Sequence, residues 1–297
     1  MKAIQWIISA LVAVVIIVCP AAVVGGVYFT RLKSIHSIRK LTDYEDYNLY
    51  RMDIDYAYDL DRLIDRGITD NQSMINAILA EALPYLPIHM KAPNFGCSAF
   101  CTQGTDGHTL MGRNYDFKND TSAMLVYCTP KDGYASVAFA ALDNINANTP
   151  DASMAKKLAT LTAPFICLDG MNEKGVSIAV LTLDSEPVHQ NTGKPTIATT
   201  LAIRLVLDRA ATTEEAVQLL SSYDMFASSG RDYHFYITDA SGDGRVVEYD
   251  CEKETRPLVA TPMEAITNFY DLYRDKVLPN QRNGIYGHGR ERYDAVM

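Results

Sequence analysis

Helical periodicity marks the chain upstream of position 85. Apolar residues recur at helical spacing over Met74–Leu83, Asp70 or Asn71 can cap that run, and Pro84 ends it. A shorter helix fits residues 56–66. The amphipathic helix over Met74–Leu83 predicts a partner surface for its apolar face.

Downstream of position 96, apolar runs separated by turn sequences predict antiparallel strand pairs. The clearest turn is Asp106-Gly107, because Asp-Gly readily adopts the positive φ angles of a tight hairpin. The same reasoning predicts strand pairs at 123–129 with 134–142, at 165–168 with 176–183, and at 233–238 with 246–249. The polar residues 143–151 predict a loop that could line a substrate mouth.

Three helices are predicted among these strands. Residues 196–209 carry a broad apolar face, and Thr212-Thr213-Glu214-Glu215 is a capping box that opens a helix reaching position 222. A short helix is expected around 153–161. Helices beside packed strand pairs predict an α+β fold with helices on one side of antiparallel sheets.

The N-terminus carries a nearly uninterrupted apolar run, Ile7–Phe29, long enough at helical rise to cross a bilayer. It exceeds the usual apolar region of a signal peptide, so we expect a membrane anchor or signal segment over residues 1–32, with a cleaved signal peptide as the alternative. Lys and Arg residues flank both sides and leave the orientation open. We expect an extracytoplasmic domain, because short N-terminal apolar segments most often direct the export of the downstream domain.

Composition narrows the class of protein. The 297 residues, 48% of them hydrophobic, suffice for one catalytic domain with an N-terminal extension. A net charge of −9 argues against a nucleic-acid partner, since phosphate binding relies on clustered Lys and Arg. Six scattered cysteines predict no disulfide scaffold, and we expect no metal or other cofactor because metal-ligand spacings are absent from the sequence.

Cys97 is the candidate reactive group. It follows the small residue Gly96 and precedes the Asp106-Gly107 turn, so a hairpin would bring Arg113 and Asp116 near it. A cation beside a thiol favours the reactive thiolate, and a carboxylate could orient a proton carrier. The alternative for Cys97 is a buried strand cysteine, and for Arg113 and Asp116 a surface ion pair at a strand end.

The segment from Cys97 to Asp116 resembles the start of the mature chain in the choloylglycine hydrolase family of N-terminal-nucleophile (Ntn) amidases. That group includes penicillin V acylases, acid ceramidase and N-acylethanolamine amidase. Arg113 follows Cys97 by 16 residues, which is similar to the family's spacing. Three further matches come in the family's order: Gly170–Gly175, Ile266–Phe269 and Gly289–Tyr293.

The resemblance implies an αββα sandwich and a self-processing cysteine amidase. Cleavage of the Gly96–Cys97 bond would free the α-amine of Cys97 to act as its own base. Asp116 would then bind that amine, and Arg113 would stabilise charge near the sulfur. Asn268 would donate to the developing oxyanion, with an ordinary turn residue as the alternative.

Two further implications concern Arg292 and Thr182. Arg292 matches the family's last arginine, although Arg290 and Arg282 compete for that role. Thr182 stands where bile-salt hydrolases of the family carry an asparagine, so it would serve the oxyanion hole differently and disfavours a bile-salt substrate. Only a few residues come after Arg292, which leaves open a catalytic domain truncated at its C-terminus.

Three segments are therefore expected: an anchor over 1–32, a linker and helical prosegment over 33–96, and a catalytic domain over 97–297. The expected activity is hydrolysis of linear, non-peptide C–N bonds in a small-molecule N-acyl amide. An acyltransferase using the same acyl-enzyme, and a non-catalytic membrane-tethered binding domain, are the alternatives. A thiol-redox pair of Cys97 and Cys101 is disfavoured by their separation along an extended strand. A homo-oligomer is left open.

Overall fold

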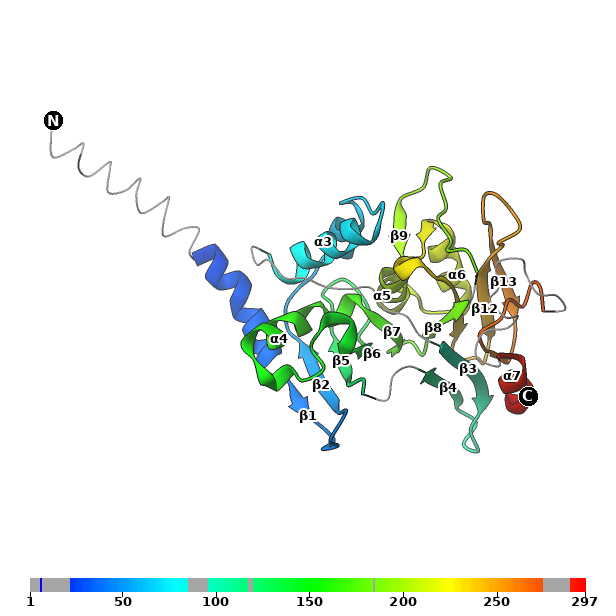
Figure 1. The fold of residues 1–297 in the computed structure, drawn as a ribbon, viewed down its shortest axis with the longest axis horizontal. Coiled ribbons are helices and arrows are strands. Elements are labelled where there is room, and N and C mark those ends of the chain that lie inside the picture. Colours follow the sequence, from blue (N-terminus) through cyan, green and yellow to red (C-terminus); the bar gives the residue numbers. More distant parts are fainter. Residues whose placement is uncertain (1–5, 7–21, 85–95, 117–119, 184, 275–288) are drawn as a thin grey trace.

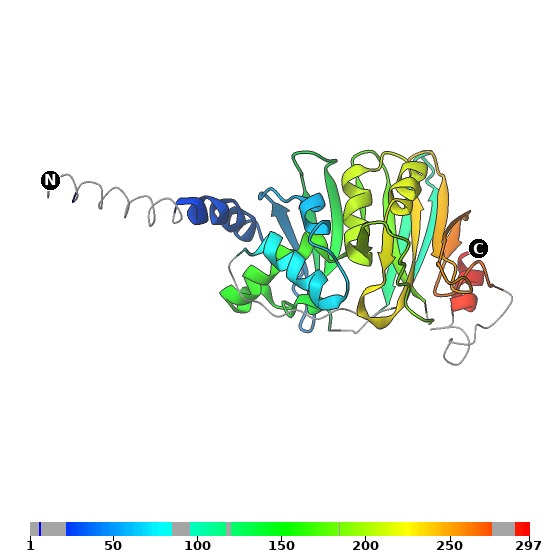
Figure 2. The same ribbon diagram turned by 90° about the horizontal axis from the view of Figure 1, so that it is seen from above.

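A nine-stranded sheet forms the centre of the protein (Figures 1 and 2). The computed structural model describes residues 6, 22–84, 96–116, 120–183, 185–274 and 289–297. Neighbouring strands of the sheet are antiparallel except β2 and β5, which are parallel. In spatial order the strands are β1 (Arg39–Lys40), β2 (Leu49–Ile54), β5 (Ala123–Cys128), β6 (Ser136–Ala141), β7 (Cys167–Asn172), β8 (Ser177–Leu183), β11 (Asp232–Thr238), β12 (Gly244–Tyr249) and β13 (Leu258–Pro262).

The middle of this sheet is covered on both faces. Every residue of β8 and β11 is buried, which explains why these strands read as continuous apolar runs rather than alternating ones. Helices α5 (Thr199–Arg209) and α6 (Thr213–Ser221) pack on one face. Thr212 caps α6 by accepting the Glu215 N–H, as predicted, whereas the Glu215 side chain accepts the Ala211 N–H rather than that of Thr212, so the capping box is only half formed.

The opposite face is covered by a three-stranded sheet of β14 (Ala265–Ile266), β3 (Gly96–Gln103) and β4 (Thr109–Asp116). The β3–β4 hairpin confirms the predicted turn, with Gly107 at φ 80°. A separate parallel pair joins β9 (Thr196–Ala198) to β10 (Asp224–Phe226).

Shorter elements complete the described chain. The remaining helices are α2 (Leu60–Ile64), α3 (Asn71–Ala82), α4 (Met154–Ala159) and α7 (Gly289–Val296). Turns of 3₁₀ helix occupy η1 (Leu142–Ile145), η2 (Pro150–Ala152), η3 (Thr160–Phe165) and η4 (Ser228–Gly230). Asp70 caps α3 in a capping box with Ser73, as the sequence suggested.

The α+β class is confirmed, and the predicted strand pairs form, although the strand expected at 165–168 is β7 at Cys167–Asn172 and pairs with β8 through Asp169–Met171. The expected four-layer αββα order is only partly present. Within the described ranges, the helix that covers the three-stranded sheet is α7, which packs against β14 and β3. The five described cysteines are free thiols.

Part of the predicted linker and helical prosegment, residues 33–96, forms strands β1 and β2 of the central sheet rather than helix alone. Strand β2 pairs along its whole length with β5 in the central sheet. Tyr56 donates to the Leu161 carbonyl (2.5 Å), and Tyr58 donates to the Asp208 carboxylate of α5 (3.0 Å). Sequence reasoning missed β2 because its short run of six residues lies in a stretch rich in Asp and Tyr.

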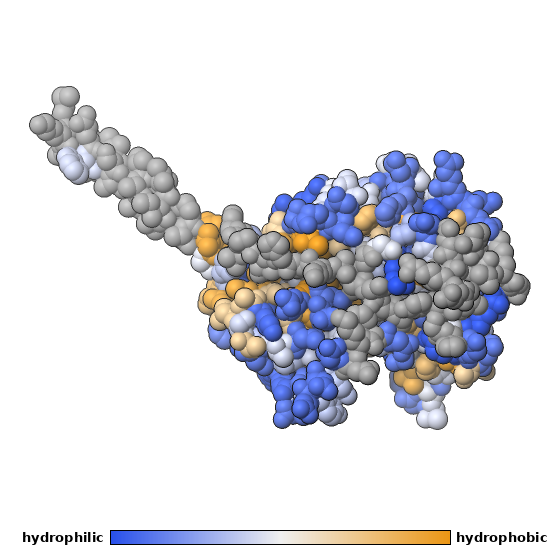
Figure 3. All heavy atoms as spheres, viewed as in Figure 1, coloured by the Kyte–Doolittle hydropathy of each residue, from blue (hydrophilic) through white to orange (hydrophobic). Residues whose placement is uncertain are grey.

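The predicted membrane segment lies mostly outside the described residues. Residues 22–36 form a helix whose Val23 and Phe29 are exposed (61% and 65%), and Figure 3 shows apolar surface where this helix meets the body. Over the described part of the chain, no helix has the length and apolar character needed to span a bilayer.

Candidate active site

The β3–β4 hairpin sorts the candidate residues onto two faces. Side chains alternate along a strand, so Cys97 and Arg113 share the face toward the central sheet, whereas Asp116 points to the other face. In the ladder, Cys97 lies opposite Tyr115, and Arg113 lies two pairs further along, opposite Ala99. This diagonal places the guanidinium over the thiol.

Arg113 is held by contacts from three strands. Its Nη2 lies 3.1 Å from Cys97 Sγ and 3.2 Å from the Val180 carbonyl, and its Nε lies 2.9 Å from Asp169 Oδ2. The ring of Tyr115 packs on the guanidinium, with Cζ 5.1 Å from the ring centroid. Arg113 Nε and Nη1 are buried and neither has a hydrogen-bond partner among the described residues, so the contact of Nε with Asp169 is an ion pair.

The thiol itself is enclosed. Cys97 has no exposed surface, and burial raises its pKa to about 11, although the charge of Arg113 opposes that rise. In the continuous chain the sulfur is therefore held mainly as the neutral thiol at neutral pH.

The Cys97 main chain is held at both its N–H and its carbonyl. Asn268 Oδ1 accepts the Cys97 N–H (2.8 Å), while Arg292 Nη1 donates to the Cys97 carbonyl (2.7 Å) and to Ser98 Oγ (2.6 Å). Arg292 Nη2 also donates to Asn268 Oδ1 (2.6 Å), which joins the two holders. From the sequence, Arg292, Arg290 and Arg282 were all candidates for the family's last arginine. Arg292 is the one that makes these contacts, and Arg282 lies outside the described residues.

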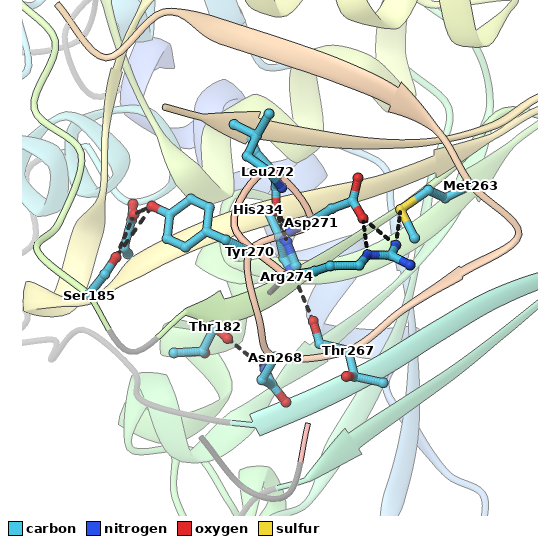
Figure 4. A network of polar contacts seen from close by, with 12 residues as sticks. Thr182, Ser185, His234, Met263, Thr267, Asn268, Tyr270, Asp271, Leu272 and Arg274 are labelled. Carbon is cyan, nitrogen blue, oxygen red and sulfur yellow. Dashed lines mark hydrogen bonds and ion pairs between the residues drawn. The ribbon is translucent and has the colours of Figure 1, made fainter. Parts of the chain in front are cut away.

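The segment that carries Asn268 is tied to the central sheet by buried polar groups (Figure 4). His234 Nε2 lies 2.9 Å from the Thr267 carbonyl, and its Nδ1 lies 3.2 Å from Glu248 Oε1. The Glu248 carboxylate also accepts the N–H groups of Asp271 and Leu272 (2.8 and 3.0 Å). These contacts fix the main chain on both sides of Asn268, so its amide is held in one place.

The expected contact between Asp116 and the Cys97 nitrogen is not made. Asp116 lies on the face away from the thiol, where it accepts from Asn114 Nδ2 (2.5 Å) and Arg292 Nη1 (3.2 Å). Asn268 occupies the position expected for Asp116. Strand alternation, which the hairpin prediction did not carry through, explains the difference.

The two residues predicted to serve the oxyanion hole, Asn268 and Thr182, differ in their contacts. Asn268 Nδ2 donates to the Thr182 main-chain carbonyl (2.6 Å), and its oxygen faces the Cys97 N–H, so the residue acts first as a holder of Cys97. Thr182 Oγ1 is buried without a hydrogen-bond partner in the described part of the chain. The pairing of β7 with β8 stops at Ala179, and the Val180 and Thr182 carbonyls beyond it accept from Arg113 and Asn268 instead.

A cavity of about 750 Å³ opens beside this cluster, between β4 and strands β5 to β8. Arg113, Tyr115 and Asp169 form its polar wall, and most of the other lining residues are apolar. Leu110, Phe139 and Met171 line it while remaining 52%, 42% and 50% exposed. The predicted loop 143–151 does not line it. The size and lining are typical of a small-molecule site.

Asp169 is the site residue that sequence reasoning missed. It is buried in β7, accepts the Phe139 N–H and faces Arg113. Burial raises its pKa, while the Arg113 charge opposes the rise. The signal was present in the sequence: an acid within the apolar run Cys167–Met171 requires a buried cation as partner.

Metal binding has no evident place in this arrangement. Among the residues whose placement is described, no group of three or more His, Cys, Asp or Glu side chains is arranged to hold a metal ion.

Comparison with known proteins places the chain in a family. A search of curated protein sequences found no match. The chain is similar to two solved structures of conjugated bile acid hydrolase from Clostridium perfringens, a mutant (18% identity, 65% of this chain and 64% of that one, TM-score 0.41) and a variant (19%, 64% and 66%, 0.42). It is also similar to penicillin V acylase from Agrobacterium tumefaciens (21%, 61% and 46%, TM-score 0.33), so it spans less than two thirds of each of these proteins.

The family model for linear amide C–N hydrolases, choloylglycine hydrolase family, matches residues 97–255. The match begins at Cys97 and ends before Asn268 and Arg292. It covers more than half of the sequence, and the chain therefore belongs to the choloylglycine hydrolase family of linear amide C–N hydrolases.

Proposed function

We propose that this protein is a self-processing cysteine amidase that hydrolyses the linear C–N bond of an N-acyl compound. The observation that carries the proposal is the contact of the buried Cys97 Sγ with Arg113, which itself lines the polar wall of a mainly apolar cavity. Family membership supports amide hydrolysis as the reaction type.

Processing would come first. Cys97 Sγ attacks the Gly96 carbonyl carbon, the C–N bond to Cys97 breaks, and the nitrogen leaves as a free amine. Water then hydrolyses the resulting thioester, giving a Gly96 carboxylate and a Cys97 with a free thiol and α-amine. Arg292 and Asn268, which hold the Cys97 carbonyl and nitrogen, would keep the new N-terminus in place.

The freed amine would then serve as the proton carrier. Its ordinary pKa is near ~8, so it can take the thiol proton around neutrality without a histidine. The thiolate attacks the substrate carbonyl carbon, the ammonium protonates the departing amine, and a thioester acyl-enzyme remains. Water, deprotonated by the same amine, releases the carboxylic acid and restores Cys97.

The cavity supports an N-acyl substrate with an apolar acyl group. The scissile carbonyl would lie at the Arg113 wall, and the acyl group would extend along the apolar lining toward Leu110, Phe139 and Met171. Conjugated bile salts, penicillin V-like amides, N-acyl amino acids and ceramide-like lipids share this design. Thr182 in place of asparagine disfavours the bile salts among them.

The deciding experiment combines intact mass with a chromogenic assay. Wild-type protein is expected to yield a chain beginning at Cys97 and to hydrolyse N-decanoyl-4-nitroanilide, whereas Cys97→Ser loses the hydrolysis whether or not it still processes. Cys101→Ser is the matched control, because Cys101 lies on the same strand and is free. An active Cys97→Ser variant would overturn the assignment of the nucleophile.

The same measurements separate the alternatives. A stable uncut chain without activity favours the non-catalytic binding domain. An acyltransferase would convert added amines into N-acyl products at the expense of free acid. Formation of the acid as the main product in the presence of a competing amine supports the hydrolase.

We further propose that the N-terminal segment anchors the protein to a membrane with the catalytic domain on the extracytoplasmic side. The apolar run Ile7–Phe29 and the exposed Val23 and Phe29 support this. The fragment upstream of Cys97, identified by peptide mass spectrometry, is expected to stay in the membrane fraction after alkaline carbonate extraction. Recovery of that fragment in soluble form and shortened at its N-terminus would favour the cleaved signal peptide.

A further inference from the structure

Asp169 stands apart from the residues already given a role. It touches neither the thiol nor the Cys97 main chain, yet its carboxylate lies 2.9 Å from Arg113 Nε at the cavity wall. A Cβ placed on the neighbouring Gly170 would lie 2.8 Å from Leu207 of α5. The alternation of β7 therefore turns Asp169 away from the helices and toward the hairpin.

The guanidinium has three nitrogens, and each has a different surrounding. Nε forms an ion pair with Asp169 (2.9 Å) without a hydrogen bond of acceptable geometry, Nη2 meets Cys97 Sγ and the Val180 carbonyl, and Nη1 is buried without a partner in the described ranges. Because the guanidinium is a rigid plane, holding Nε in one place also restricts where Nη1 and Nη2 can lie. The position of Nη2 on the sulfur thus depends on the hold at Nε.

We propose that Asp169 is a positioning residue for the amidase reaction: by holding Arg113 Nε, it keeps Nη2 on the Cys97 sulfur and Nη1 free for the carbonyl oxygen of an N-acyl substrate. This inference rests on the proposed function, because holding a cation at the thiol matters for catalysis only if Cys97 reacts.

The negative charge of Asp169 and its hold on Arg113 have opposite expected effects on the pKa of Cys97, so one variant can distinguish them. The negative charge of Asp169 by itself raises the pKa of Cys97, next to the larger effect of burial. If charge alone mattered, Asp169→Asn would lower the thiol pKa and speed alkylation. If Asp169 positions Arg113, the same variant releases the cation from the sulfur and slows alkylation.

The experiment measures the pH profile of Cys97 alkylation by iodoacetamide in the full chain, with peptide mass spectrometry as the readout. Asp169→Asn is expected to move the profile up by about one pKa unit, which is about tenfold slower at a fixed pH below the midpoint. In an Arg113→Ala background, Asp169→Asn should not slow alkylation further. An unchanged or lowered midpoint, or a further slowing in that background, would overturn the proposal.

Two further variants protect the result. Asp208→Asn removes the carboxylate of another buried pair, Arg204–Asp208, on the helix face of the sheet, and is expected to leave the Cys97 profile unchanged. Should Asp169→Asn fail to fold, Arg113→Lys replaces it: an ammonium lacks the fixed planar fork of a guanidinium, so Asp169 can no longer fix a second nitrogen on the sulfur. The midpoint should then rise, and an unchanged midpoint would refute the proposal.

Alkylation requires no turnover, so the two proposals fail separately. A raised midpoint in the Asp169→Asn variant of a protein that hydrolyses no amide would support the positioning of Arg113 and count against the amidase. An active wild type whose Asp169→Asn variant shows a lowered midpoint would support the amidase and refute the positioning of Arg113 by Asp169.

Discussion

The two faces of the central sheet each carry a buried arginine, aspartate and cysteine. On the cavity face, Arg113 meets Asp169 and Cys97. On the helix face, Arg204 meets Asp208 (2.7 Å) and donates to Ser136 Oγ (2.5 Å), and Ser136 lies opposite Cys128 in the β5–β6 ladder. The residue types are the same, so composition alone cannot distinguish a reactive site from a structural one.

The thiols do not distinguish the clusters either. Neither Cys97 nor Cys128 is exposed, and burial raises the pKa of each to about 11 against the opposing charge of its arginine. The difference lies in the surroundings. Arg113 forms the wall of a cavity and the Cys97 main chain is held by Asn268 and Arg292, whereas Arg204 is enclosed by α5 and the sheet.

The largest expected effect separates the clusters by stability. Arg204→Ala leaves the Asp208 charge buried without a cation and should lower the free energy of unfolding by about 3–5 kcal/mol. Arg113→Ala should cost clearly less, because water can enter from the cavity and solvate Asp169. Urea unfolding monitored by tyrosine fluorescence measures both variants, and equal losses would remove the distinction between the two faces.

Thiol reactivity gives the next contrast. A pKa of about 11 lies above that of a free cysteine, so less thiolate is present at pH 8 in the uncut chain: about one part in a thousand, against about a quarter for an ordinary cysteine near 8.5. Iodoacetamide should therefore label Cys97 and Cys128 slowly until the pH approaches 11. Processing should accelerate Cys97 alone, since only Cys97 gains an adjacent amine. Equal acceleration of Cys128 would contradict the site assignment.

The amidase reaction offers a third contrast. Arg113→Ala should lower kcat/KM for N-decanoyl-4-nitroanilide by about a hundredfold, the usual effect of losing a charge-stabilising donor. Arg204→Ala, assayed per folded molecule below its unfolding temperature, should stay within about threefold of wild type if it acts only through stability. A similar loss in both variants would mean that Arg113 is structural too.

Local sequence signals predicted the strands well and the site in part. The Asp106-Gly107 turn and the spacing to Arg113 correctly brought the guanidinium to Cys97, because a hairpin fixes its own register. The same hairpin should have turned Asp116 to the other face, and the prediction overlooked that alternation. Asp169 depends on how β7 lies against a hairpin more than 50 positions earlier, so the local pattern could show only that it needed a partner.

Strand β2 was missed for a related reason. Its partner β5 lies about 70 positions away, across the proposed cleavage point, and a parallel pairing leaves no turn sequence to reveal it. The N-terminal region therefore read as a separable segment, while in the fold it completes the central sheet and reaches the Arg204 cluster.

The smallest expected effect tests the contact between the N-terminal region and the Arg204 cluster. Tyr58 donates to both oxygens of Asp208 (3.0 Å each), so Tyr58→Phe should lower the free energy of unfolding by about 1.5–3 kcal/mol, as expected for a lost hydrogen bond to a charged group. Because Tyr58 precedes the proposed cleavage point and Asp208 lies after it, the variant should also release more of the N-terminal fragment from processed protein on size-exclusion chromatography in dilute urea. Tyr44→Phe is the control, since Tyr44 is 57% exposed and lies in the connection between β1 and β2. Equal fragment release by both variants would show that the bond to the Arg204 cluster does not hold the two chains together, and would leave the β2–β5 pairing as the main contact between them.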